Sequence, residues 1–112
     1  MTQKNLNDLE KIKNHYSYDA QSRQAIEEMA ELTQAINKKW RVGTGAGYAT
    51  SEIAKQTDWN NHIAEEIADV YICLKQLEMY LDIGEDVDGY IDMKIERTLK
   101  RMEVKNERLY QM

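Results

Sequence analysis

The stretch Ala25-Ile-Glu-Glu-Met-Ala-Glu-Leu32 places three glutamates among apolar residues in the first half of the chain. A second stretch, Ala64-Glu-Glu-Ile-Ala-Asp-Val70, repeats this arrangement further along. Both contain two carboxylates spaced i and i+3, which lie about one turn apart on the same side of a helix. Apolar residues interleave both stretches, so neither looks like a solvated helix face. We expect the fold to bring the two acidic stretches together.

The composition favours helix throughout the chain. The 112 residues include no proline and only five glycines, and good helix formers such as Glu, Lys, Leu and Ala are abundant. A chain of this length builds one domain with a core of limited size, so we expect a single domain over residues 1–112 that self-associates. Charged residues at 31% and hydrophobic residues at 42% are typical of a soluble, folded protein.

Charge and cysteine content argue against several classes of protein. No apolar run approaches the length of a membrane span, and the first residues lack the apolar region of a signal peptide. The single cysteine, Cys73, cannot form an internal disulfide, which favours the reducing cytoplasm. A net charge of −5 argues against a general nucleic-acid binder. We therefore expect a cytoplasmic protein with neither a membrane nor a nucleic-acid partner.

Apolar periodicity and capping residues predict four helices, over about residues 2–16, 20–40, 58–84 and 86–109. Ser17 or Asp19 is a candidate cap for the second helix, and Asp86 or Asp88 begins the fourth. Three glycines mark a flexible loop over residues 41–48, and a short helical piece is expected to end at Lys55. These elements predict an all-α, bundle-like fold.

Placing side chains at about 100° per residue separates apolar from polar faces. On the second helix an apolar stripe consists of Ile26, Met29, Thr33, Ile36 and Trp40. Beside it runs a polar line of Gln21, Gln24, Glu28 and Glu31, whereas Glu27 turns further away. On the third helix an apolar arc consists of Trp59, Ile63, Ile67, Val70, Cys73, Leu74, Leu77 and Leu81. Glu66 falls inside that arc and Asp69 at its edge. A smaller strip of Ala68, Ile72 and Met79 suggests contact with another helix or subunit.

A carboxylate in an apolar face is costly unless a cation compensates its charge. If the second and third helices pack through their apolar stripes, carboxylates converge from two sides and repel one another. The converging residues are Glu28, Glu31, Glu66 and Asp69. A divalent ion resolves this conflict, and the all-oxygen set favours Mg²⁺ or Mn²⁺ over zinc.

The fourth helix presents basic residues beside its apolar stripe. Lys94, Arg97 and Arg101 either reach into solvent and pair with neighbouring acids, or bind phosphate oxygens of a ligand held by the metal. His15 and His62 are interpreted as structural or exposed. An alternative is a non-catalytic helical interaction module whose acidic faces are solvated. A redox or storage carboxylate protein is disfavoured because the chain contains no Glu-x-x-His pair.

The two acidic stretches match a known pattern. Glu27-Glu-Met-Ala-Glu31 followed by Glu66-Ile-Ala-Asp69 resembles the EExxE…ExxD signature of the MazG-like all-α nucleoside triphosphate pyrophosphohydrolases. Gln21 stands before the first stretch where such proteins often carry glutamine, and the segment Lys94-Ile-Glu-Arg97 looks like the Lys-x-x-Arg of the family's last helix. The resemblance spans roughly residues 20–102.

The resemblance implies Mg²⁺-dependent hydrolysis of a nucleoside triphosphate to the monophosphate and pyrophosphate, with Mn²⁺ as a substitute ion. It also implies a role in clearing nucleotide pools and assembly into dimers or tetramers. By motif position, the metal ligands are Glu28, Glu31, Glu66 and Asp69. Glu27 supports a ligand or orients the attacking water. Lys94 and Arg97 hold phosphates, and Gln21 touches the nucleotide near its sugar or base.

Overall fold

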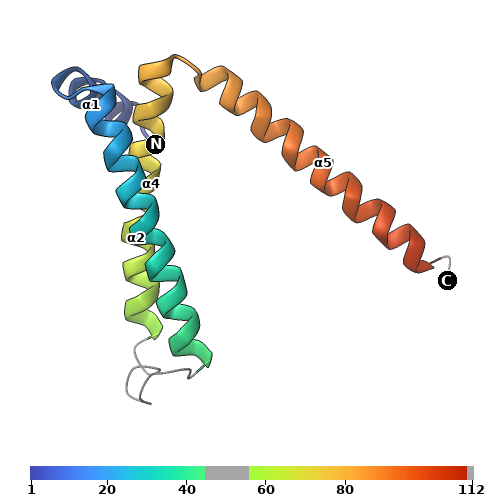
Figure 1. Cartoon of the computed structure of the whole chain (residues 1–112). Coiled ribbons are helices and arrows are strands. Elements are labelled where there is room, and N and C mark those ends of the chain that lie inside the picture. The colour runs from blue at the N-terminus through green and yellow to red at the C-terminus, as the bar shows by residue number, and fades with distance from the viewer. Residues whose placement is uncertain (45–55, 111–112) are drawn as a thin grey trace. The chain divides into compact units, whose positions relative to one another are not determined.

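The structure, a computed structural model, describes residues 1–44 and 56–110. These residues form four helices, which are α1 (Gln3–His15), α2 (Tyr18–Thr44), α4 (Gln56–Leu81) and α5 (Gly84–Tyr110) (Figure 1). The prediction of an all-α chain with four helices is confirmed. The expected helical piece ending at residue 55 lies outside the described residues.

The chain divides into two compact units, Met1–Tyr80 and Leu81–Met112. The first unit contains α1, α2 and nearly all of α4, whereas the second contains α5. The expectation of one domain over residues 1–112 stays a prediction.

Side-chain caps explain where α1 and α2 begin. The Oγ1 atom of Thr2 accepts a hydrogen bond from the backbone N–H of Asn5 at 3.1 Å, which caps α1. The Oγ atom of Ser17 accepts one from the N–H of Ala20 at 3.1 Å. Of the two candidate caps, Ser17 is therefore the one used, and Asp19 lies in the first turn of α2. The predicted loop begins too early, because helix continues through Thr44 and includes Gly43.

The boundary between α4 and α5 also differs from the expectation. Helix α4 ends at Leu81, and Asp82 has a φ of 53°. A left-handed backbone stops a helix, and Asp tolerates this conformation better than most residues do. Gly84 therefore begins α5 instead of ending α4, and α5 starts two residues before Asp86. Glu85 and Asp86 lie in its first turn, where negative charge stabilises a helix N-terminus.

Helices α1 and α4 are joined by two hydrogen bonds from the second half of α4. The Nε2 atom of Gln76, whose side chain is 0% exposed, donates to the carbonyl oxygen of Leu9 at 2.8 Å. The hydroxyl of Tyr80 donates to the carbonyl oxygen of Lys13 at 2.7 Å. Ala68 and Ile72 line a hollow of about 350 Å³ together with residues of α1. The strip that they form thus faces another helix of the same chain.

Helices α2 and α4 lie side by side and run in opposite directions (Figure 1). The rings of Tyr18 at the start of α2 and Tyr80 near the end of α4 make an edge-to-face contact, with centroids 6.0 Å apart. Ala25 and Ala35 are buried on α2, and Val70 and Cys73 are buried on α4. Small side chains on α2 allow the two helix axes to approach closely.

The apolar stripe of α2 is not the face that this helix buries. Its large apolar members stay exposed in the structure: Ile26 at 54%, Met29 at 41%, Ile36 at 51% and Trp40 at 64%. The buried face instead carries Ala25, Ala35 and the half-buried Leu32. It lies roughly a quarter turn around the helix from the apolar stripe. The alanines lie against α4 because small residues permit closer packing than the bulky stripe does. We call Ile26, Met29, Ile36 and Trp40 the exposed stripe.

The arc predicted for α4 is also only partly buried. Val70 and Cys73 are buried, whereas Ile67, Leu74 and Leu81 are exposed. The buried face of α4 is shifted towards Glu66 and Gln76, which are its buried polar residues. Within the part of the chain that the structure describes, no helical segment combines the length and the hydropathy that a membrane span requires.

Candidate metal centre

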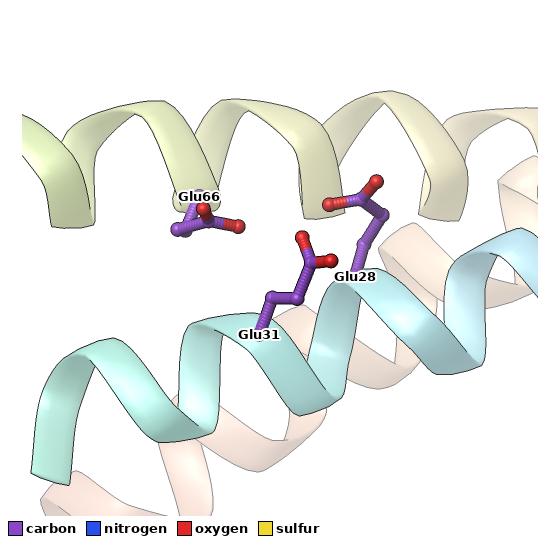
Figure 2. Close-up of side chains that lie close together, drawn as sticks. All are labelled: Glu28, Glu31 and Glu66. Carbon is purple, nitrogen blue, oxygen red and sulfur yellow. The ribbon is translucent and has the colours of Figure 1, made fainter.

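Three carboxylates from two helices meet between α2 and α4. Glu28 and Glu31 extend from α2 and Glu66 extends from α4, and the side chains point towards one another (Figure 2). Each offers one oxygen atom, and these three oxygens all lie within 4.8 Å of one another. We call these residues the glutamate cluster. The antiparallel pairing of α2 and α4 brings together residues that are more than thirty positions apart in the sequence.

Burial differs among the three glutamates. Glu66 is 9% exposed, Glu28 is half-buried and Glu31 is exposed. The Oε2 atoms of Glu28 and Glu66 are buried, and neither has a hydrogen-bond partner among the described residues. A buried carboxylate oxygen without a partner costs free energy, since water no longer solvates its charge. Among the described residues, these two oxygens thus have no hydrogen-bond donor that would offset this cost.

Glu28 and Glu66 are the two less exposed members of the cluster. In each of them the second carboxylate oxygen, Oε1, has a neighbouring side chain on the same helix. The Nε2 atom of Gln24 donates a hydrogen bond to Oε1 of Glu28 at 2.7 Å. The Nε2 atom of His62 lies 3.8 Å from Oε1 of Glu66, close enough for an ion pair but too long for a hydrogen bond. Each neighbour stands four residues before its glutamate, which is the spacing of side chains on one helix face.

Repulsion within the cluster changes the titration of its outermost member. The pKa of Glu31 is raised above its ordinary value of 4.5, chiefly by the negative charge of Glu28. Desolvation, a hydrogen bond with Glu28, and the charges of Glu66 and Glu27 raise the pKa further, in that order. In the metal-free protein, Glu31 thus holds a proton more tightly than an isolated glutamate does.

The negative field extends to the cysteine beside the cluster. Burial is the main cause that raises the pKa of the Cys73 thiol, and the charges of Glu28 and Asp69 raise it further. A cysteine with a raised pKa stays a thiol at neutral pH and is a poor nucleophile. Cys73 is therefore a core residue, in agreement with its place in the apolar arc.

The cluster fits a hard divalent cation. Three carboxylate oxygens already lie close together, and two of the glutamates have a buried oxygen with no hydrogen-bond partner in the described part of the chain. An all-oxygen donor set suits Mg²⁺ or Mn²⁺, whereas zinc sites favour histidine and cysteine ligands. A divalent cation would offset the mutual repulsion and the desolvation of these carboxylates.

Asp69, which the sequence places with these glutamates, and Glu27, which it turns away from them, both lie outside the cluster. Asp69 is exposed on α4, one turn after Glu66, and is not part of the group within 4.8 Å. Its role as a metal ligand stays a prediction. Glu27 is exposed on α2 and acts on the cluster through its charge, which contributes to the raised pKa of Glu31.

The predicted substrate-binding residues lie on α2 and α5. Gln21 is half-buried on α2, two turns before Glu28. Lys94 and Arg97 are exposed on α5, which belongs to the second unit. Within α5, the carbonyl oxygen of Lys94 accepts a hydrogen bond from Oγ1 of Thr98 at 2.9 Å. The phosphate-binding role of both basic residues stays a prediction.

Sequence reasoning did not assign a function to Gln24 or His62. The sequence places Gln24 on the polar line of α2 without a role, and it predicts that His62 is structural or exposed. The structure places both beside cluster carboxylates. The i, i+4 spacing of Gln24 to Glu28 and of His62 to Glu66 was the signal available in the sequence.

Comparisons of this chain with protein-family models, with curated proteins and with solved structures found no match.

Proposed function

We propose that this protein is an Mg²⁺-dependent nucleoside triphosphate pyrophosphohydrolase of the cytoplasm, which converts a (deoxy)nucleoside triphosphate to the monophosphate and pyrophosphate. The observation that carries the proposal is the convergence of Glu28, Glu31 and Glu66, with the buried Oε2 of Glu66 unpartnered among the described residues. The resemblance of the two acidic stretches to the MazG-like signature supplies the reaction.

The glutamates are proposed to hold the metal ion, and Asp69 to join them as a fourth ligand. Bound Mg²⁺ would neutralise phosphate charge and lower the pKa of a coordinated water. The carboxylates would fix the position of the ion, and this position determines where the charged phosphates of the triphosphate are held. Glu27 is proposed to support a ligand or to orient the water that attacks the α-phosphorus, with pyrophosphate as the leaving group.

Three further residues are proposed to contact the nucleotide, on the strength of the resemblance alone. Lys94 and Arg97 would hold phosphate oxygens, for which ammonium and guanidinium groups are suited. Gln21 would contact the sugar or the base. Removal of unwanted triphosphates from the nucleotide pool is the physiological role that this chemistry would serve.

Self-association as a dimer or tetramer is part of the proposal. The exposed stripe of α2 presents four large apolar side chains on one helix face. A contiguous apolar face of this kind commonly marks a protein–protein contact. A second copy of the chain is the occupant proposed here, because the resembling family assembles in this way.

A screen of nucleoside triphosphates with Mg²⁺ tests the reaction. Release of pyrophosphate and orthophosphate is measured separately for each nucleotide. We expect pyrophosphate from at least one nucleotide, loss of turnover in Glu66→Gln, and retained turnover in Glu65→Gln, the exposed neighbour on the same helix. Circular dichroism verifies that both variants stay folded. No pyrophosphate from any nucleotide would overturn the proposal, and orthophosphate alone would place attack at another phosphorus.

A further inference from the structure

The same local arrangement occurs on both helices that supply the glutamate cluster. On α2, Gln24 donates to Oε1 of Glu28 at 2.7 Å, and on α4, His62 lies 3.8 Å from Oε1 of Glu66. In both glutamates the remaining oxygen, Oε2, is buried and has no hydrogen-bond partner in the part of the chain that the structure describes. A hydrogen bond thus holds Oε1 of Glu28, and His62 makes a looser contact with Oε1 of Glu66, while both Oε2 atoms are open among the described residues.

Holding one oxygen fixes how a carboxylate presents the other. A glutamate side chain rotates freely about its last torsion, which has broad, roughly two-fold preferences. A partner on Oε1 narrows that rotation and so fixes the direction of Oε2. Hydrogen bonds to the groups that ligate a metal commonly serve this purpose, and they also raise metal affinity.

Stability alone gives little reason for these contacts. Gln24 is exposed and the side chain of His62 is 46% exposed, and pairs at i, i+4 on exposed helix surfaces contribute little to stability. On α1, Gln3 donates to Oδ1 of Asn7 at 2.9 Å with the same spacing. Neither residue belongs to the carboxylate cluster found among the described residues, so the pair shows what an ordinary helix-surface contact looks like in this chain.

We propose that Gln24 and His62 are positioning residues for a divalent cation at the glutamate cluster. Each contacts Oε1 of the glutamate one turn later on its helix and leaves Oε2 as the oxygen that ligates the ion. The two residues act through Glu28 and Glu66 and do not themselves contact the metal. The inference rests on the proposed function, since it requires a divalent cation at the cluster.

Mn²⁺ titration of the full chain, followed by the electron paramagnetic resonance signal of free Mn²⁺, tests the inference without measuring turnover. Gln24→Met removes the donor and keeps the length of the side chain, and we expect affinity to fall by about 10- to 100-fold, the usual effect of losing a group that orients a ligand. His62→Leu should cause a smaller loss, because its contact is longer than a hydrogen bond.

Two controls separate positioning from a general structural effect. Gln3→Met makes the same chemical change at the ordinary pair on α1 and should leave Mn²⁺ affinity unchanged. His62→Gln places an amide donor one turn before Glu66, as Gln24 stands before Glu28, and should bind Mn²⁺ like the wild-type protein. The melting temperatures of Gln24→Met and Gln3→Met in EDTA should agree, because both lose a comparable surface contact.

The outcomes distinguish this inference from the proposed function. If the wild-type protein binds no Mn²⁺, the proposed metal and the positioning role fail together. If the wild-type protein binds Mn²⁺, and Gln24→Met and His62→Leu bind it as tightly as the wild-type protein does, the positioning role is overturned and the metal site stands. Equal losses in Gln24→Met and Gln3→Met would likewise overturn it.

Discussion

Replacing Glu66 with glutamine should make the metal-free protein more stable and the metal-bound protein less stable. Glu66 is 9% exposed, and its carboxylate lies within 4.8 Å of that of Glu28. Two unit charges at that separation repel by about 3.5 kcal/mol at an effective dielectric constant of about 20. Glutamine has nearly the same shape and removes this repulsion, and its amide can donate to a neighbouring carboxylate.

Several effects reduce that gain. Glu28 is only half-buried, so solvent screens part of the repulsion, and the contact with His62 is lost at a cost of at most about 0.3–0.5 kcal/mol. We expect a net gain of about 1 kcal/mol, which raises the melting temperature by roughly 4–8 °C in a domain of this size. With metal at 100 times its dissociation constant, the wild-type protein gains about 2.7 kcal/mol that the variant largely lacks.

Thermal denaturation of Glu66→Gln and the wild-type protein, each in EDTA and in saturating Mg²⁺, measures both effects. We expect the order of the two melting temperatures to reverse between the two conditions. Glu65→Gln serves as the control, because Glu65 is exposed and lies outside the glutamate cluster. If Glu66→Gln lowers the melting temperature in EDTA, the glutamates do not destabilise the metal-free fold and the reasoning fails.

Three further predictions concern titration, packing and assembly. Because the pKa of Glu31 is raised above 4.5, folding favours its protonated form, and the metal-free protein should lose stability as pH rises from 4.5 through the raised pKa. Glu31→Gln should remove that decline, which thermal melts recorded in EDTA across this pH range would measure. Gln76→Ala deletes a fully buried side chain and its hydrogen bond to Leu9, and should lower the free energy of unfolding in urea by about 2–4 kcal/mol. Gln76→Met keeps the side-chain volume and should lower it by less than about 1.5 kcal/mol. Equal losses in the two variants would contradict the packing argument. Ile36→Glu places a charge on the exposed stripe and should shift the sedimentation coefficient to that of a monomer without changing the helix content. A sedimentation coefficient that stays the same would show that this stripe is not the contact between copies of the chain.

Local signals in the sequence determined the secondary structure. Four helices follow from apolar periodicity and from good helix formers. The Ser17 cap is predictable because it is local: the hydroxyl accepts a hydrogen bond from the N–H three residues later. The ends of helices were less predictable. The reversal at Asp82 depends on one left-handed residue, and helix continues through Gly43 although glycine is a weak helix former.

Tertiary structure alone decided which helix faces meet. Periodicity identifies an apolar face, but it does not reveal that α2 packs through Ala25 and Ala35 while Ile36 stays exposed, because that choice depends on how closely two backbones approach. The same packing sets the membership of the glutamate cluster. Glu66 stood out in the sequence as a carboxylate in an apolar arc, whereas only the pairing of α2 with α4 brings Glu28 and Glu31 within 4.8 Å of it. A local pattern cannot supply a distance between residues on two helices, since that distance is a property of their packing.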